Sequence, residues 1–170
     1  MVNLWLDRRV GDDIVARSEA SFPLETGGLL VGYMTEQGPV VTALIGAGPS
    51  ATATSTSFLP DAQAQQLELN DIYLRTQGQD TYLGDWHSHP AGLSAMSRRD
   101  RRTLASIARH PRARLARPVM LIAAGAQGRW ELGCFIAERR FLGVSFDCIA
   151  VRMFLPSAAA SPPEHRSAHL

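Results

Sequence analysis

The alternation of apolar and polar residues along the chain predicts strands interrupted by three helices. Apolar runs bounded by turn residues predict strands over residues 2–6, 26–34, 39–45, 80–89, 118–124, 129–137 and 141–151. Helical spacing of apolar residues, with capping residues and prolines at the ends, predicts helices over residues 8–21, 61–77 and 97–110. This order of elements favours an α+β domain with a mixed sheet.

The segments between these elements also differ in character. The strands over residues 26–34 and 39–45 are apolar throughout, which predicts burial on both faces. Residues 46–57 are small and polar, and predict a flexible loop of the kind that often contacts substrates. Residues 156–170 have the composition of a disordered tail. We therefore expect one domain over residues 1–155, followed by a tail over residues 156–170.

Composition narrows the class of protein. The chain has 170 residues, of which 45% are hydrophobic and 19% charged, so it can bury a core and is not disordered as a whole. A net charge of +1 argues against nucleic-acid or anionic-membrane partners. No apolar run approaches the roughly 18 residues of a membrane span, and the first residues do not resemble a signal peptide. Cys134 and Cys148 are too few for a disulfide framework, so we expect a soluble cytoplasmic protein, with Cys134 as a small buried residue.

The basic residues are unusual, because all 17 are arginine and the chain contains no lysine. A GC-rich genome favours arginine codons and explains this without any function. The alternative is protection from enzymes that attach proteins to lysine side chains, because arginine keeps the charge but cannot act as the nucleophile at neutral pH. The sequence leaves both explanations open.

The residues that could bind a metal ion lie in His87-Ser88-His89-Pro90 and the segment that follows it. Alternate side chains of a strand point to one face, so His87 and His89 would lie side by side. Imidazole and carboxylate groups are common zinc ligands, and a catalytic zinc keeps three protein ligands with one open position. Asp100, in the first turn of the next predicted helix, is near enough in sequence to supply the third ligand.

Each of these features also has an explanation without chemistry. A pair of histidines can arise by chance, and Ser97-x-x-Asp100 is the pattern of a helix capping box. The arginines at residues 98–102 are typical of a solvated helix face. Trp86 could stiffen the strand beside the histidines or serve only in the core.

The spacing of these residues resembles a known signature. His87, His89, Ser97 and Asp100 follow the pattern H-x-H-x(7)-S-x-x-D of the JAMM (MPN+) metalloprotease family. That family adds a glutamate near an early strand, and Glu25 in PLETGGLLVG occupies this place. The resemblance extends over roughly residues 2–151 and implies a mixed, curved β-sheet flanked by helices, similar to the architecture of cytidine deaminases.

The resemblance also implies a role for each residue. His87, His89 and Asp100 would hold one Zn²⁺ ion per chain, and Glu25 would be the general base that takes a proton from the attacking water and passes it to the leaving amine. Ser97 would stabilise the developing oxyanion. Trp86 and Pro90 would form a rigid surround for the ligands.

The family implies a class of substrate as well. JAMM enzymes typically cleave the amide bond after the C-terminal glycine of a ubiquitin-like protein, and the compact chain looks most like prokaryotic members. Some of these act in antiphage operons of the CBASS type, beside homologues of ubiquitin-activating and ubiquitin-conjugating enzymes. We therefore expect a bacterial deconjugating isopeptidase acting in antiphage defence.

Three other functions are weighed against this one. The first is processing of a ThiS/MoaD-type sulfur-carrier protein, which the sequence does not separate from deconjugation. A non-catalytic MPN-type scaffold would have lost the ligands, so the complete set of Glu25, His87, His89 and Asp100 argues against it. A RadC-like DNA-repair relative would carry a helix-hairpin-helix segment, which we do not find.

Overall fold

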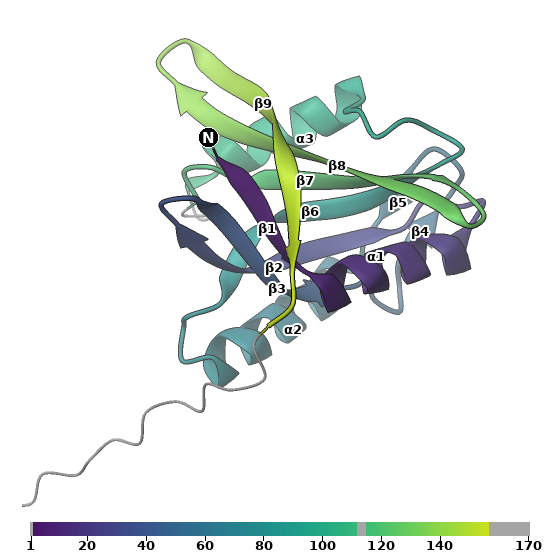
Figure 1. Cartoon of the computed structure of the whole chain (residues 1–170), viewed down its shortest axis with the longest axis horizontal. Helices are drawn as coiled ribbons and strands as arrows, with labels where there is room; N and C mark the ends of the chain where they lie inside the picture. Colours follow the sequence, from purple (N-terminus) through teal and green to yellow (C-terminus); the bar gives the residue numbers. More distant parts are fainter. Residues whose placement is uncertain (1, 112–114, 157–170) are drawn as a thin grey trace, which may run out of the picture.

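The backbone forms one strongly curled β-sheet with helices packed against it (Figure 1). The structure is a computed structural model and describes residues 2–111 and 115–156. In sheet order the strands are β1 (Asn3–Asp7), β3 (Gly38–Ile45), β2 (Gly27–Thr35), β6 (Thr81–Pro90), β7 (Val119–Ala126), β8 (Arg129–Arg140) and β9 (Gly143–Phe154). The first strand, β1, pairs in parallel with both β3 and β9, and this double pairing curls the sheet.

The sheet is mixed, as the sequence predicts. Strand β6 pairs in parallel with β7 and antiparallel with β2, and β7, β8 and β9 form an antiparallel meander. The helices are α1 (Arg8–Ser21), α2 (Ala62–Arg75) and α3 (Arg98–Arg109). The predicted α+β class, with a mixed, curved sheet flanked by helices, is confirmed.

The core divides between the two faces of the sheet because strand side chains alternate. Leu30 and Leu121 point into the main cluster, where Val10 and Ile14 of α1 also lie. Their neighbours point the other way: Val31 packs with Ile72 of α2, and Ile122 packs with Leu104 of α3. Helix α1 therefore fills one face of the sheet, and α2 and α3 cover the other.

N-cap side chains fix the residue at which each helix begins. Asp7 accepts a hydrogen bond from the backbone N–H of Arg9, and Asp61 accepts one from Ala64, as the sequence predicts for Asp61. Ser97 and Asp100 form a capping box at the start of α3. This box sets the position of the first turn of α3 beside the sheet.

One predicted loop contains additional structure. Within and just after residues 46–57, β4 (Thr52–Ala53) and β5 (Phe58–Leu59) pair as a small antiparallel hairpin. Strands of two residues are too short to produce a recognisable alternation, so the sequence pattern does not reveal them. The hairpin matters for the site, because the backbone N–H of Glu25 donates to the carbonyl oxygen of Thr54 at 2.8 Å.

Cys134 and Trp86 both lie in the core of the domain. Cys134 is buried, as predicted, and Trp86 lies in the main core with its indole N–H donating to the carbonyl oxygen of Ile45. Among the helices in the described ranges, none has the length and apolar character needed to cross a bilayer. The predicted C-terminal tail, apart from Pro156, lies outside the described residues.

Candidate functional site

Three side chains predicted as metal ligands converge at the end of β6. The Nε2 atoms of His87 and His89 lie 3.0 Å apart, as expected for side chains two residues apart on one strand face. The Asp100 carboxylate from α3 lies 3.3 Å from Nε2 of His87 and 3.5 Å from Nε2 of His89. The three ligand atoms therefore form a compact triangle between a strand and a helix.

The dimensions of this triangle suit a tetrahedral metal ion. For bonds of about 2.0–2.1 Å, two ligand atoms of a tetrahedron stand roughly 3.3–3.4 Å apart. The observed separations of 3.0, 3.3 and 3.5 Å bracket that value. Two imidazole lone pairs and a carboxylate placed so close together would repel one another, and a cation among them removes that repulsion.

A hydrogen bond holds His89 in the orientation that a ligand requires. Its Nδ1 lies 3.0 Å from the backbone carbonyl oxygen of Leu93, which can only accept, so Nδ1–H is the donor. In the neutral ring this leaves the Nε2 lone pair directed at Asp100 and His87. Metal-binding histidines are commonly fixed in this manner by a carbonyl group.

Asp100 serves both the helix and the cluster. Its carboxylate accepts a hydrogen bond from the backbone N–H of Ser97 at 2.7 Å, while Ser97 Oγ accepts from the N–H of Asp100 at 3.2 Å. The capping interpretation and the metal-ligand interpretation are therefore compatible, because the box orients the carboxylate toward the histidines.

Glu25 is held beside the histidines by pairing between the start of β2 and the end of β6. Ser88 Oγ accepts from the N–H of Thr26 at 2.9 Å, and the N–H of Ser88 donates to the carbonyl oxygen of Thr26 at 2.7 Å. Gly27 then pairs with His87 in the sheet. The middle residue of the His-Ser-His motif thus anchors the segment that carries Glu25.

The surroundings of Glu25 and Asp100 shift the pKa values of these two carboxyl groups in opposite directions. Burial raises the pKa of Glu25, and the charges of His87 and His89 offset this only in part. Burial would also raise the pKa of Asp100, but its interactions with His87 and His89 hold that pKa well below its usual range. Asp100 in turn raises the pKa of His89. Asp100 is therefore a firm anion, whereas Glu25 is a stronger base than an ordinary surface glutamate.

A cavity of about 620 Å³ brings the five predicted residues together. Its wall includes Glu25, His87, His89, Ser97 and Asp100, and Ser97 itself is exposed at the start of α3. The structure therefore places every sequence-predicted site residue on one cavity. Their catalytic roles stay predictions.

Sequence reasoning missed several residues of this cavity. Asp85 lies two residues before His87 on the same strand face, and it accepts a hydrogen bond from the Tyr82 hydroxyl at 2.7 Å. Burial raises the pKa of Asp85. Strand alternation could have found Asp85, since it continues the series His89, His87. Phe58 of β5 and Arg99 of α3 also line the cavity, and no sequence pattern points to them.

Comparisons with known proteins agree on a family. The family model described as prokaryotic homologs of the JAB domain matches residues 7–133. The chain is 37% identical over 137 residues to a probable metalloprotease, y4qB, of Sinorhizobium fredii, a match that covers 79% of this chain and 84% of that protein. It is 31% identical over 117 residues to a CD-NTase/cGAS isopeptidase of Enterobacter hormaechei, covering 68% of this chain and 64% of that protein.

A solved structure shares the fold. The solution structure of protein DSY2949 from Desulfitobacterium hafniense superposes with a TM-score of 0.65 at 22% identity, covering 98% of this chain and 99% of that one. The metalloprotease relative implies a metal ion, and the cluster of His87, His89 and Asp100 is a site that could hold one. The chain belongs to the family of prokaryotic homologs of the JAB domain and is a JAMM-type hydrolase.

Proposed function

We propose that this protein is a zinc-dependent isopeptidase. It hydrolyses the amide bond after the C-terminal glycine of a ubiquitin-like protein, or of a protein conjugated by a bacterial ubiquitin-like system. The observation that carries the proposal is the convergence of Glu25 and the cluster of His87, His89 and Asp100 on one cavity. The isopeptidase name of two curated relatives supports it.

The residues divide the chemical work among them. His87, His89 and Asp100 would hold Zn²⁺, which when bound lowers the pKa of water and polarises a carbonyl group. Glu25 accepts the proton of the attacking water, because its carboxylate faces the same cavity and burial has raised its pKa. It then gives that proton to the leaving amine, so one carboxylate serves as base and acid in turn.

Ser97 is placed to act on the developing oxyanion. Its Oγ accepts from the backbone of Asp100, and its hydroxyl hydrogen remains free to donate into the cavity. A donor aimed at an oxyanion typically contributes about 3–4 kcal/mol to the stability of the transition state. The capping box holds this donor at a fixed distance from Asp100, so no reorganisation is needed during the reaction.

The cavity suits an extended peptide tail. The β4–β5 hairpin contributes Ser55, Thr56 and Phe58 to one wall, and Gly92 lies in the loop after β6. An extended chain can add alongside such a hairpin, where main-chain hydrogen bonds provide affinity. A tail that ends in glycine carries no side chain there that could clash with these walls.

The setting that we propose is deconjugation in the bacterial cytoplasm during antiphage defence. The support is the name of the relatives from Enterobacter hormaechei and Escherichia coli, CD-NTase/cGAS isopeptidase, which ties each of them to a CD-NTase. The partners would then be a conjugated protein and the activating and conjugating enzymes that made the conjugate.

A defined fusion tests the proposal. A ubiquitin-like protein joined through its C-terminal glycine to a reporter protein should be cleaved directly after that glycine, as read by mass spectrometry. A chelator should abolish cleavage, and added zinc should restore it. A ThiS/MoaD-type carrier fusion cleaved while conjugation-system fusions stay intact would replace deconjugation with sulfur-carrier processing. If no fusion is cleaved by the zinc-loaded protein, the proposal fails.

A further inference from the structure

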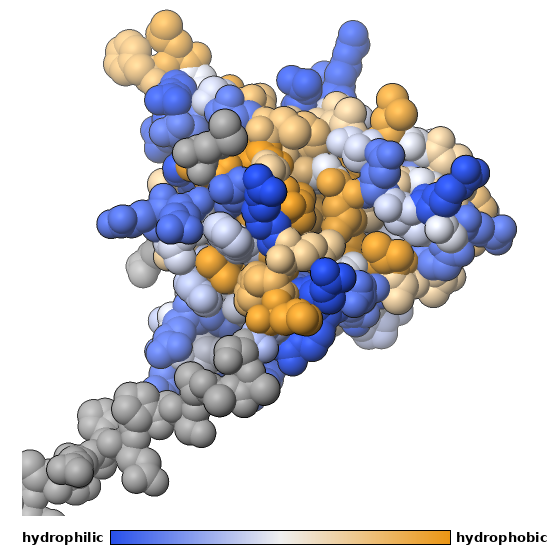
Figure 2. Space-filling view, viewed as in Figure 1, coloured by the Kyte–Doolittle hydropathy of each residue, from blue (hydrophilic) through white to orange (hydrophobic). Residues whose placement is uncertain are grey.

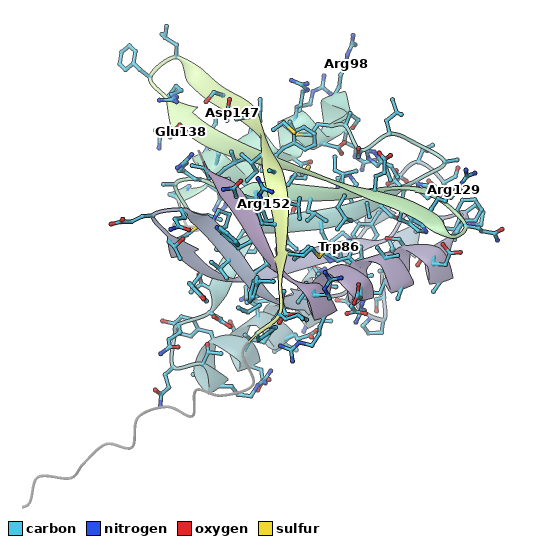
Figure 3. All side chains as sticks on the ribbon, in the orientation of Figure 1. Trp86, Arg98, Arg129, Glu138, Asp147 and Arg152 are labelled. Atoms are coloured by element: carbon cyan, nitrogen blue, oxygen red, sulfur yellow. The ribbon has the colours of Figure 1, made fainter. Side chains whose placement is uncertain are left out.

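The outer surface of α3 carries a concentration of positive charge that the proposed chemistry does not use. Among the 12 residues of this helix are Arg98, Arg101, Arg102 and Arg109, all exposed, which we call the α3 arginine face. Arg98 projects outward from α3 at the top of the molecule in Figure 3. The chain as a whole has a net charge of only +1, so this face is a local feature.

The arginines of this face have no acidic partners within the described residues. The ion pairs of that part of the chain lie elsewhere, on Arg9, Arg17 and Arg75 and at the β8–β9 end, where Arg140 contacts Glu138 at 2.7 Å. The one acidic residue of α3, Asp100, is buried and turned toward the histidines. Within the described residues, no ion pair therefore neutralises these exposed arginines.

The face also has a shape. Arg101, Arg102 and Arg109 surround a shallow hollow whose floor includes Ala105 and Phe146 of β9. The guanidinium carbon of Arg101 lies 6.0 Å from the centre of the Phe146 ring, at the outer limit of a cation–π contact. An apolar floor with a basic rim can hold a protein surface that combines acidic and apolar side chains.

The face begins at the proposed active site. Arg99, one residue from Arg98, lines the cavity that holds Glu25 and the histidines. From Arg99 the helix runs for about 15 Å, at 1.5 Å per residue, to Arg109. Figure 2 shows hydrophilic residues standing out at the top of the molecule, where Figure 1 places α3.

We propose that the α3 arginine face is a docking surface for an acidic face of the protein that carries the scissile amide bond. This inference rests on the proposed function, because docking along α3 would bring that protein's linkage to the cavity. A protein fits better than nucleic acid, since DNA binding depends on several phosphate contacts spread along a duplex. Here the charge is confined to one short helix beside an apolar hollow.

The mechanism is electrostatic capture. Complementary charges raise the rate of encounter by about 10- to 10³-fold, and that gain falls steeply with ionic strength. Charges at the rim of an interface act mainly on association and on salt dependence. The face should therefore lower KM for acidic substrates and leave kcat unchanged.

The test uses two matched probes. One is a fluorescein-labelled 16-residue peptide of alternating Glu and Ser, and the other replaces each Glu with Gln. Each peptide is measured by anisotropy against the full chain, and each is also placed after the scissile glycine of the reporter fusion. We expect the acidic peptide to bind at least about tenfold more tightly at 50 mM NaCl, and its fusion to show a KM about tenfold lower.

The variants locate the effect. The double variant Arg102→Glu/Arg109→Glu should lose both advantages, and neither residue lies in the proposed catalytic machinery. The control is Arg129→Glu/Arg152→Glu, which changes the net charge equally at two exposed arginines on other parts of the surface (Figure 3). It should keep both advantages within about twofold.

Three results would overturn the inference. If both double variants lose the affinity and KM advantages equally, the effect is one of general charge. If the acidic peptide has no advantage over the Gln peptide with the wild-type protein, the α3 arginine face is not a docking surface for acidic proteins. A 16-base-pair DNA duplex that binds more tightly than the acidic peptide at 150 mM NaCl would assign the face to nucleic acid. If no fusion is cleaved but the anisotropy results hold, the proposed function fails and the docking surface remains.

Discussion

Glu25 is the residue on which the proposed reaction depends most directly. Glu25→Gln removes the base but no ligand of the metal cluster, so turnover should fall at least about 10³-fold while the bound metal is retained. The ratio of turnover numbers and elemental analysis of the purified variant check this. Activity within about tenfold of wild type would mean that another group moves the proton.

Ser97 has two roles that substitution can separate. Ser97→Ala removes both the hydroxyl and the cap, whereas Gly retains much of the capping preference at a loss of a few tenths of a kcal/mol. Both variants should lower turnover by roughly 10²-fold, the usual effect of losing an oxyanion donor. In urea unfolding the alanine variant should be less stable by about 1 kcal/mol, and the glycine variant by only a few tenths of a kcal/mol. A glycine variant with full activity would leave Ser97 as a cap alone.

The candidate site could be predicted residue by residue only where sequence spacing and local geometry coincide. His87 and His89 lie together because they are two apart on one strand, and Asp100 joins them through a capping box that is itself a sequence pattern. Glu25 is different, because its position depends on the long-range contact between Thr26 and Ser88. The resemblance to the family signature identified Glu25 as a site residue, whereas strand alternation and capping patterns could not.

At the scale of elements, the contact between β2 and β6 fixes the distance from Glu25 to the histidines. A Cβ atom on Gly27 would lie 2.5 Å from the carbonyl oxygen of Trp86 and 2.9 Å from Cβ of His87. Because backbone atoms cannot move aside, Gly27→Ala should push the strands apart. We expect at least tenfold lower turnover and about 1–3 kcal/mol lower stability.

A second glycine provides the matched control for that variant. A Cβ atom on Gly46 would meet only the guanidinium end of Arg17, a flexible side chain whose ion pair with Asp13 is exposed to solvent. Gly46→Ala should therefore leave turnover unchanged and alter the unfolding free energy by less than about 0.5 kcal/mol. If both alanine variants behave alike, close strand contact at Gly27 is not what positions Glu25.

Helix α1 begins at a buried acidic cap that makes stability depend on pH. Hydrogen bonds from Arg9 lower the pKa of Asp7 below its ordinary value of 3.8. The charged cap therefore stabilises the fold above about pH 3.8, and this contribution is lost as pH falls toward the lowered value. Asp7→Ala should cost about 1 kcal/mol at pH 7, measured by urea unfolding.

Asp7→Asn distinguishes the contribution of the Asp7 charge to stability from that of its hydrogen bond to the helix. Asp7→Asn keeps an acceptor for the N–H of Arg9 but carries no charge, so it should lose less stability than Asp7→Ala at pH 7. Its difference from wild type should shrink below pH 3.8, because there the Asp7 carboxylate of the unfolded chain takes up a proton before that of the folded chain does. A difference that stays constant down to pH 2 would contradict the lowered pKa.

Elements long enough to contain several apolar residues in a recognisable pattern could be predicted from the sequence, whereas two-residue strands could not. Helix α1 lies close to its predicted range because its apolar residues are helically spaced, and β2 and β6 lie close to theirs because each is an apolar run bounded by turn residues. Strands β4 and β5 contain two residues each and depend on their mutual pairing. The order of strands in the sheet is likewise a matter of distant contacts, such as β1 beside β9.

At the scale of the whole molecule, the cluster of His87, His89 and Asp100 joins the end of a strand directly to the start of a helix. His87 and His89 end β6, whereas Asp100 belongs to α3, which packs on the face formed by β7 and β8. An ion that binds the folded chain and not the unfolded one stabilises it by about 2.7 kcal/mol at 100 times its dissociation constant. For a domain of this size that corresponds to a melting temperature about 5–10 °C higher.

Chelation should therefore lower the melting temperature of the wild-type protein by about that amount, and His89→Ala should melt at the same temperature with and without chelator. Hydrogen exchange of the chelated protein should rise at the start of α3, because no ion then connects Asp100 to the histidines of β6 and that turn depends on the capping box. Exchange in β9 should not change, since its hydrogen bonds to β1 and β8 do not involve the residues of the cluster. A uniform rise across the sheet, or an equal shift in His89→Ala, would place the bound metal somewhere other than between β6 and α3.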